Sequence, residues 1–326
     1  MGIEDIRQFL KPQMQKVEAL IEESLFTDIR LLNATNSSLR SSPGKMLRPA
    51  LSLLVAGALG AVTEDTFRYA AATELLHNAT LLHDDVVDGA TERRGLPTAF
   101  RLMGGGPAVL LGDFWLVRCI GRVLSAPGVT FRVVQLYADT LSHLAEGELL
   151  QMEKASSGDT TEEDYLRIIY GKTASLFEVA AVTAALSTGV SEEKVSAMGS
   201  FARNLGLAFQ IKDDIFDYSS KSGALGKPVG IDLKEQKITQ PLLCALEKVS
   251  PSEEALIRNK VTQAAEKPEY VAEIQEFVRN NGGVQAAVGK MEKHLEDALS
   301  FLKALPESEA KTHLETLAAY VVDRSV

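Results

Sequence analysis

The sequence predicts an all-α protein, and three observations support this prediction. Apolar residues recur at helical steps of three, four or seven over most of the chain, beginning with Ile6, Leu10, Val17, Ile21 and Leu25. Alternating apolar and polar runs, which indicate half-buried strands, are scarce. Signals that begin and end helices follow one another at short intervals. We therefore expect about ten or more helices joined by short loops.

The helix boundaries can be predicted from capping residues and breaks. Thr63, Thr161 and Ser191 each precede acidic residues, as helix N-caps do. Breaks rich in Gly, Pro, Ser or Asn are expected at residues 41–44, 104–107, 126–128, 219–230 and 280–283. Residues 69–82 and 176–186 are apolar around most of the helix circumference, so these two segments are expected to be central helices.

Composition argues against several classes of protein. The 326 residues carry a formal net charge of -10, which disfavours nucleic acid as a partner because backbone phosphates need clustered Lys and Arg. No apolar stretch reaches the ~18 to 20 residues of a membrane helix, so we do not expect an integral membrane protein. Residues 1–10 do not resemble a secretory signal, which predicts a cytoplasmic protein with Cys119 and Cys244 as reduced, buried thiols. Without a low-complexity linker or fixed repeat, a single domain over residues 1–326 is predicted.

Two aspartate-rich clusters of the form DDxxD end strongly apolar helices. They are Asp84, Asp85 and Asp88, after a helix expected over residues 70–87, and Asp213, Asp214 and Asp217, after a helix expected over residues 201–216. Within each cluster the first and last carboxylates lie on one helix face, ~5 to 6 Å apart. Like charges at this spacing cost about 0.2 to 0.5 kcal/mol, and the C-terminal end of the helix dipole adds about 0.3 to 1 kcal/mol. Local physics therefore disfavours both clusters.

A bound magnesium ion would remove this conflict. Mg²⁺ takes one or two carboxylates, keeps several waters and completes its octahedron with phosphate oxygens. We therefore interpret the clusters as two halves of a diphosphate clamp. For one isolated cluster, a solvated polar helix end would be an equally good interpretation. The apolar segments that lead into both clusters, residues 79–88 and 207–217, argue against two solvated ends.

With both motifs intact and in order, residues from about 44 to 243 resemble the trans-isoprenyl (polyprenyl) diphosphate synthases of the medium- or long-chain type. The resemblance implies a helical bundle of the isoprenoid synthase type with a central cavity. It also implies a transferase of isoprenoid biosynthesis that condenses isopentenyl diphosphate with dimethylallyl, farnesyl or geranylgeranyl diphosphate, giving a longer all-trans polyprenyl diphosphate. The implied cofactor is Mg²⁺, with three ions per active site beside the bound diphosphate. A homodimer is expected, and transient contact with membranes that receive the apolar product is left open.

Cationic and polar residues around the motifs complete the expected site. By this resemblance, isopentenyl diphosphate would be held by Lys45, Arg48, His77 and Arg94. The allylic diphosphate would contact Arg93, Lys172, Thr173, Gln210, Lys227 and Lys237. All six clustered aspartates would bind metal, and the residues expected to act in catalysis are Asp84, Asp85, Asp88, Arg93, Lys172, Asp213 and Lys227. Each cation alone is better explained as a surface charge, but together they supply the donors that two diphosphates need. Pro43 departs from the family pattern, which usually has a second Gly there, and removes no proposed ligand.

The length of the product is expected to depend on the pocket below the first cluster. The residues that would line it are Leu76, Ala79 and Thr80, on or beside the helix face that carries Asp84. In the family, a bulky residue near Ala79 or Thr80 closes the pocket and gives short products. The small residues here therefore suggest a medium or long chain, with Tyr137 or Leu141 as candidates for the floor.

Other interpretations of these motifs require residues or activities of their own. Gly171-Lys172-Thr173 would need a Gly at Leu166 and a preceding strand to form a phosphate-binding P-loop, so that interpretation is rejected. No second His or Cys stands at zinc-site spacing from His83, which favours a supporting or core role for this residue. An isoprenoid cyclase would not need the isopentenyl-binding cations, and consumption of isopentenyl diphosphate would separate the two enzymes. A helical regulatory subunit without catalysis would be inactive with both substrates.

Overall fold

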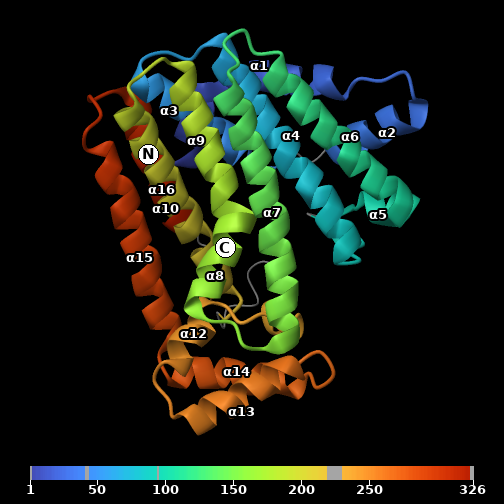
Figure 1. Cartoon of the computed structure of the whole chain (residues 1–326), viewed down its shortest axis with the longest axis vertical. Coiled ribbons are helices and arrows are strands. Elements are labelled where there is room, and N and C mark those ends of the chain that lie inside the picture. The colour runs from blue at the N-terminus through green and yellow to red at the C-terminus, as the bar shows by residue number, and fades with distance from the viewer. Residues whose placement is uncertain (1, 41–43, 94, 219–229, 324–326) are drawn as a thin grey trace. The chain divides into compact units, whose positions relative to one another are not determined.

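The computed structural model describes residues 2–40, 44–93, 95–218 and 230–323, and it confirms the all-α prediction (Figure 1). The α-helices are α1 (Ile3–Leu25), α2 (Arg30–Arg40), α3 (Leu47–Leu59), α4 (Glu64–Val87), α5 (Ala99–Met103), α6 (Gly105–Leu124), α7 (Phe131–Ser157), α8 (Glu162–Ile169), α9 (Ser175–Ser187), α10 (Glu192–Phe216), α11 (Ile231–Lys234), α12 (Gln240–Leu246), α13 (Pro251–Thr262), α14 (Glu269–Asn280), α15 (Gly283–Leu302) and α16 (Glu309–Asp323). A π-helical turn, η1 (Tyr170–Ala174), joins α8 to α9. A short antiparallel pair, β1 (Glu92–Arg93) and β2 (Leu96–Pro97), follows α4.

The predicted caps match these boundaries, and the breaks match in part. The breaks at 126–128 and 280–283 fall at helix ends, and residues 41–43 and 219–229 lie outside the described residues. The break at 104–107 is confined to Gly104, because α6 begins at Gly105 and its first turn tolerates Pro107. Thr161 and Asp164 form a capping box at the start of α8, in which each side chain accepts a hydrogen bond from the other residue's backbone N–H. Thr63 caps α4 by accepting a hydrogen bond from the backbone N–H of Thr66. The two helices that carry the aspartates end at Val87 and Phe216, as the sequence predicted. Local signals alone therefore fix where both acidic clusters fall.

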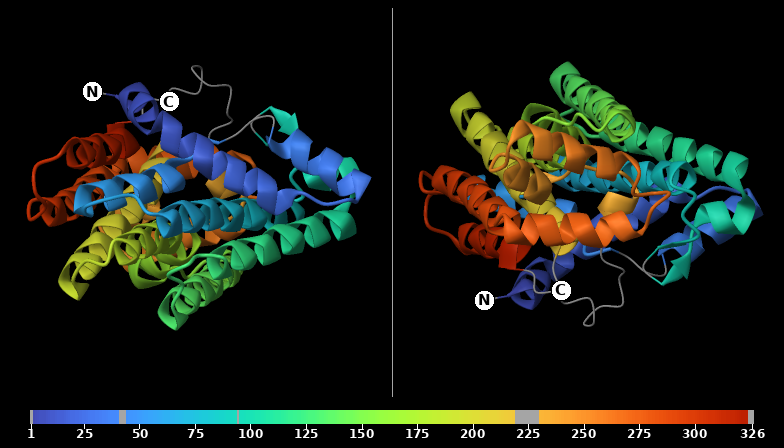
Figure 2. Two further views of the ribbon diagram at one scale, coloured as in Figure 1. Left: turned by 90° about the horizontal axis from the view of Figure 1, so that it is seen from above. Right: turned by 90° about the horizontal axis from the view of Figure 1, so that it is seen from below.

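The chain divides into two compact units. Unit 1 comprises Met1–Asp139, Leu176–Gly199 and Ala304–Leu317, and unit 2 comprises Thr140–Ser175, Ser200–Lys303 and Ala318–Val326. In unit 1, α4 packs against α1, α3 and α6 (Figure 2). The middle of α4, from Tyr69 to Leu76, is buried on every side, as expected for a central helix. The single domain over residues 1–326 stays a prediction.

Unit 2 has its own core. Helix α12 packs against α14 and α15 and also contacts α8. From Phe201 to Ile215, α10 buries one apolar residue on nearly every turn. Tyr165 and Tyr218 are fully buried beside it, so the second acidic cluster ends a helix that is anchored in the core.

Two expectations from composition can be compared with the structure. Cys119 and Cys244 are both buried free thiols, as predicted. The expectation that no apolar stretch reaches the length of a membrane helix was wrong for one stretch of the described residues. Glu162–Ser187 is long and apolar enough to cross a membrane, but 83% of its apolar window is buried inside the protein. A buried stretch of this kind is equally typical of a core helix.

Candidate active site

The first acidic cluster divides its carboxylates between two environments. Asp85 is 4% exposed, and its Oδ1 accepts hydrogen bonds from Arg93 Nε at 2.8 Å and Nη2 at 2.7 Å. Burial raises the pKa of Asp85, and the Arg93 guanidinium opposes this rise. Asp84 is half-buried and Asp88 is exposed. Asp85 therefore anchors Arg93, and the more accessible pair, Asp84 and Asp88, is better placed to meet a ligand.

Arg93 reaches Asp85 because the chain turns back after α4. The backbone N–H of Ala90 donates to the carbonyl of Asp85 at 2.9 Å, which closes the end of the helix. Arg93 then pairs with Leu96 across the short β1–β2 ladder. Arg94 lies outside the described residues. The ladder thus sets the side chain of Arg93 against the first cluster.

Three residues expected to bind isopentenyl diphosphate belong to unit 1. Lys45 is exposed just before α3, and His77 is half-buried on α4, two turns before Asp84. The guanidinium of Arg48 on α3 lies 4.9 Å from the ring centroid of Phe177 on α9, a cation–π contact that orients it. The structure therefore holds Arg48 in place, and its role in substrate binding stays a prediction.

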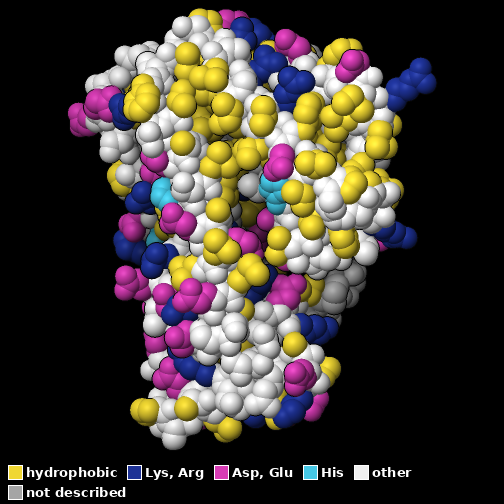
Figure 3. All heavy atoms as spheres, turned by 45° about the vertical axis from the view of Figure 1, so that its right-hand side comes forward, with side chains coloured by type: hydrophobic (Ala, Val, Ile, Leu, Met, Phe, Trp, Pro, Cys, Tyr) yellow, Lys and Arg dark blue, Asp and Glu magenta, His cyan; other side chains and the backbone are white. Residues whose placement is uncertain are grey.

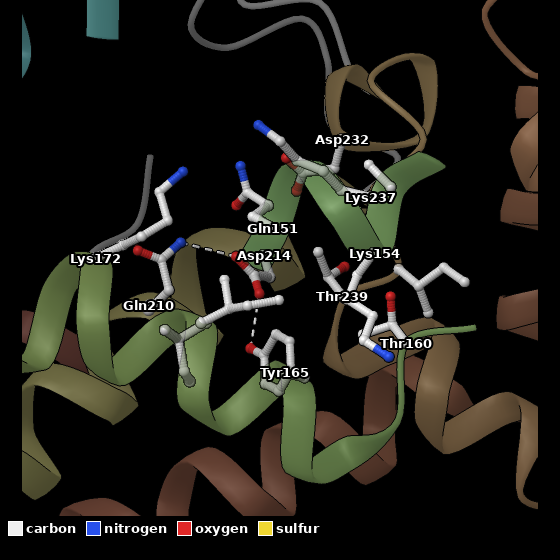
Figure 4. A pocket seen from close by; sticks show the side chains of 14 residues that line it. Gln151, Lys154, Thr160, Tyr165, Lys172, Gln210, Asp214, Asp232, Lys237 and Thr239 are labelled. Carbon is white, nitrogen blue, oxygen red and sulfur yellow. Dashed lines mark hydrogen bonds between the residues drawn. The ribbon is translucent and has the colours of Figure 1, made fainter. Parts of the chain in front are cut away.

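Asp214, in the second cluster, is buried at the centre of a hydrogen-bond chain in unit 2 (Figure 4). Its Oδ2 accepts from the Tyr165 hydroxyl at 2.7 Å, and its Oδ1 accepts from Gln210 Nε2 at 2.9 Å. The carbonyl oxygen of Gln210 in turn accepts from the hydroxyl of Thr173 at 2.7 Å. Burial raises the pKa of Asp214 to about 6, although both hydrogen bonds favour its ionised form.

Asp217 caps the segment that follows the second cluster. Its Oδ1 accepts hydrogen bonds from the backbone N–H groups of Gly230 and Ile231, both at 2.9 Å, and its Oδ2 accepts from that of Asp232 at 3.1 Å. Gln275 Nε2 also donates to the carbonyl oxygen of Asp217 at 3.0 Å. Asp217 therefore fixes the start of α11. Asp213 and Asp217 are both half-buried, whereas Asp214 is buried.

A cavity of 240 Å³ in unit 2 collects several of the predicted residues. Those that line it are Lys172, Gln210, Asp214 and Lys237, while Lys227 lies outside the described residues. In Figure 4, Lys172 and Gln210 lie to one side of Asp214, and Lys237 lies to the other. Lys172 is also ion-paired with Glu148 on α7. Cationic groups and a buried carboxylate thus share one small space.

Other polar residues line this cavity and were not predicted from the sequence: Gln151, Lys154, Thr160, Tyr165, Asp232 and Thr239. Of these, Asp232 bears most on chemistry. Its burial, and then the nearby charges of Asp214 and Asp217, raise its pKa to about 8. No local sequence signal marks Asp232, because its position depends on the cap that Asp217 provides.

The residues of the clusters suit Mg²⁺ better than a metal held by protein alone. Among the described residues, no three His, Cys, Asp or Glu side chains form a group that could hold a metal ion. Mg²⁺ commonly uses one or two carboxylates together with substrate phosphates, which the pair Asp84 and Asp88 can offer. His83 instead faces α6, with Nε2 3.3 Å from Asp113 Oδ1 and from the carbonyl oxygen of Val109.

Tyr137 and Leu141 are the candidates for the floor of the pocket that would set product length. Tyr137 is fully buried in unit 1, and its hydroxyl donates to the carbonyl of Tyr69 at 2.9 Å and lies 3.0 Å from the hydroxyl of Thr73. Leu141 is half-buried in unit 2. The role of either residue as a floor stays a prediction.

An all-α fold with two acidic helix ends and lysines around a buried carboxylate is typical of helical enzymes that act on diphosphates. The sequence profile of the polyprenyl synthetase family matches residues 29–278, and the chain belongs to this family. It is 37% identical over 325 residues to the octaprenyl diphosphate synthase of Haemophilus influenzae, covering 100% of this chain and 98% of that protein. It is 35% identical over 324 residues to the Escherichia coli enzyme of the same name, covering 99% of both.

Solved structures of family members resemble the chain over nearly its whole length. A decaprenyl diphosphate synthase from Rhodobacter capsulatus matches with a TM-score of 0.92 and 33% identity, covering 99% of both chains. A polyprenyl synthase from Caulobacter crescentus, crystallised with calcium and isoprenyl diphosphate, matches with a TM-score of 0.90 and 32% identity. This match covers 99% of this chain and 98% of that one.

Proposed function

We propose that this prenyltransferase condenses isopentenyl diphosphate with an allylic prenyl diphosphate and so makes a longer all-trans polyprenyl diphosphate. Relatives named octaprenyl and decaprenyl diphosphate synthases support this reaction. The observation that carries the proposal is the cavity of unit 2, where Lys172, Gln210 and Lys237 line the same space as Asp214. Lysine and amide donors suit diphosphate oxygens, and the carboxylates near them suit a hydrated divalent cation.

The proposed reaction begins with ionisation of the allylic diphosphate. Lys172, Lys237 and Arg93 stabilise the negative charge that builds on the leaving diphosphate, so the bond to the allylic carbon breaks. The double bond of isopentenyl diphosphate then attacks that carbon. Loss of a proton, for which the departing diphosphate is the candidate base, restores an allylic product that is one unit longer. No side chain acts as a nucleophile in this scheme.

Magnesium is the proposed cofactor, with three ions per active site when diphosphate is bound. The carboxylates of each acidic cluster would hold Mg²⁺, which would supply Lewis-acid stabilisation of the leaving diphosphate. The relative from Caulobacter crescentus, with calcium and isoprenyl diphosphate, supports a divalent cation in this role. Cytoplasmic location is part of the same proposal.

Elongation with labelled substrate tests the proposed function. The purified chain, Mg²⁺, radiolabelled isopentenyl diphosphate and farnesyl diphosphate should give labelled products of medium or long chain length. Omitting Mg²⁺ should abolish the incorporation of label. A cyclic hydrocarbon formed without isopentenyl diphosphate would point to a cyclase instead. Inactivity with both substrates would favour a regulatory subunit.

We expect Ala79→Tyr to shorten the product. Ala79 is buried on α4, five residues before Asp84 and so ~7.5 Å along the helix. A tyrosine ring there leaves room for only about one or two isoprene units, each ~5 Å long by C–C bond geometry. Sizing of radiolabelled products made from dimethylallyl diphosphate should therefore show chains of about two or three units in place of longer ones. Ala61→Tyr, at an exposed loop position, is the matched control, and an unchanged product length in Ala79→Tyr would contradict the pocket.

We also propose a homodimer formed through α6. Leu110, Val117 and Leu124 recur every seven residues on this helix and are 69%, 67% and 56% exposed. Figure 3, which brings the right-hand side of Figure 1 forward, shows a surface with many apolar side chains on this face. A contiguous apolar stripe is typical of a protein–protein interface, and a second copy of the chain is the proposed partner.

Val117→Asp should convert the dimer to a monomer. Burying an unpaired carboxylate in the middle of an interface costs several kcal/mol, which corresponds to at least ~10²-fold in dissociation constant. Size-exclusion chromatography with light scattering would measure the mass. Leu256→Asp is the control, because Leu256 on α13 is 55% exposed and lies outside the stripe. A Val117→Asp protein that stays dimeric would exclude this surface.

A further inference from the structure

The π-helical turn η1 presents two of the residues proposed to contact diphosphate. In this turn the backbone N–H of Ser175 donates to the carbonyl of Tyr170, five residues earlier, where an α-helix would use a carbonyl four residues earlier. The extra residue lies in the stretch that holds Lys172 and Thr173. Single π-turns inside helices are rare and occur frequently at functional sites. The contacts that hold this turn therefore affect the positions of the side chains at the cavity.

The position of η1 is transmitted to the cavity by hydrogen bonds. The Thr173 hydroxyl donates to the carbonyl oxygen of Gln210, which turns the amide nitrogen of Gln210 towards Asp214 (Figure 4). Asp214 is held from its other oxygen by Tyr165 on α8. These hydrogen bonds allow only one orientation of the Gln210 side-chain amide. A shift of η1 would therefore move the carboxylate of Asp214 as well as Lys172.

Glycines press against η1 from two neighbouring helices. A Cβ atom added to Gly206 on α10 would lie 2.6 Å from the Cα of Ala174. One added to Gly147 on α7 would lie 3.0 Å from the backbone nitrogen of Lys172, and one on Gly171 would lie 2.5 Å from the carbonyl oxygen of His143. These partners are backbone atoms, so no side chain can move aside to make room.

Glycine is an unfavourable choice at these helical positions. In a helix interior it costs about 0.5 to 1 kcal/mol relative to alanine. Gly147 is the only glycine of α7, and both it and Gly206 are buried. Their local cost is explained by the close approach of the backbone of η1. A methyl group at Gly206 would prevent this approach, and one at Gly147 would push the backbone of η1 away slightly.

We propose that Gly147 and Gly206 are positioning residues for the allylic diphosphate. They allow α7 and α10 to pack directly on the backbone of η1. This packing sets where Lys172 stands at the cavity and where Thr173 meets Gln210. The inference rests on the proposed prenyltransferase function. Neither glycine touches substrate, so both act through the turn.

Alanine substitutions at the two glycines test this inference. Gly206→Ala should lower kcat/KM for farnesyl diphosphate by ~10 to 100-fold, because misplacing reacting groups by about 1 Å costs up to about 10²-fold. Gly147→Ala, with the longer contact, should lose less. The KM for isopentenyl diphosphate should stay within about twofold in both, since its proposed ligands Lys45, Arg48 and His77 belong to unit 1. Mg²⁺-dependent binding of inorganic pyrophosphate, measured by calorimetry, should weaken in parallel.

Gly289→Ala is the matched control for these variants. Gly289 lies inside α15, and a Cβ added there would meet no atom within 4 Å, so its kinetics should equal those of the wild type. A folded Gly206→Ala protein with wild-type kcat/KM would overturn the inference, as would equal losses for both substrates. If Gly206→Ala does not fold, the kinetics of Gly147→Ala test the inference. If neither variant folds, the two glycines contribute to stability alone and the inference is overturned. An inactive wild type would instead refute the proposed function, and pyrophosphate binding would still report on the turn.

Discussion

Asp84→Ala is expected to lower kcat by ~10³-fold or more and to leave the protein folded. Asp84 and Asp88 are the accessible pair of the first cluster, and a bound Mg²⁺ would supply several kcal/mol of charge stabilisation in the transition state. Each 1.36 kcal/mol that is lost corresponds to a tenfold slower reaction. Single-turnover elongation of farnesyl diphosphate over a range of Mg²⁺ concentrations would measure both the loss and a shift to higher Mg²⁺. Thermal unfolding should change little, because the substitution removes one of two like charges at a helix C-terminus.

Asp85→Asn is the internal control for this experiment. Asp85 is buried against Arg93, so its substitution should lower the free energy of unfolding by about 1 to 3 kcal/mol through the weakened charged hydrogen bonds. Its Mg²⁺ dependence should shift less than that of Asp84→Ala. If Asp84→Ala keeps kcat within tenfold of the wild type, Asp84 is not a metal ligand. If only Asp85→Asn changes the Mg²⁺ dependence, the two roles are reversed.

The fold could be predicted from the sequence because its signals are local. The capping box of Thr161 and Asp164 spans four residues, and the burial of Tyr69 to Leu76 follows from an apolar composition all round the helix. The turn η1 was not predicted. The sequence Tyr170–Ala174 contains no break signal beyond Gly171 and reads as continuous helix, while the glycines that accommodate it stand on α7 and α10.

The candidate site could be predicted as a set of residues but not as a set of roles. Both clusters were evident because like charges at helix ends need a counter-ion. Some of these carboxylates accept hydrogen bonds from residues that are distant in sequence, and the motif alone does not show which ones. Asp214, for example, accepts a hydrogen bond from Tyr165, which lies 49 residues earlier. In the same way, Asp85 is committed to Arg93 only because a short hairpin returns the chain. Asp232 was missed because its place depends on backbone contacts with Asp217.

Asp217→Ala should destabilise the protein and reduce its activity together. The Asp217 carboxylate accepts three backbone hydrogen bonds from the start of α11. Hydrogen bonds to a charged group contribute about 1.5 to 3 kcal/mol each and are not additive, so we expect a loss of about 2 to 4 kcal/mol in the free energy of unfolding. Asp232 and Lys237 line the cavity just beyond this cap. Their displacement should lower kcat/KM for the allylic substrate by ~10 to 100-fold, as losses behind a metal site do.

Asp217→Asn separates a positioning role from a ligand role at this residue. The asparagine oxygen can still accept from Gly230 and Ile231, but its amide group would meet the N–H of Asp232 donor to donor. If Asp217 is a positioning residue, the losses should be graded. The free energy of unfolding, measured with denaturant, and kcat/KM should both be lower in Asp217→Asn than in the wild type and lowest in Asp217→Ala. A residue that serves only as a metal ligand predicts equal losses of Mg²⁺ response in the two variants with unchanged unfolding. Because three backbone donors already occupy both oxygens of Asp217, the graded result is the one we expect.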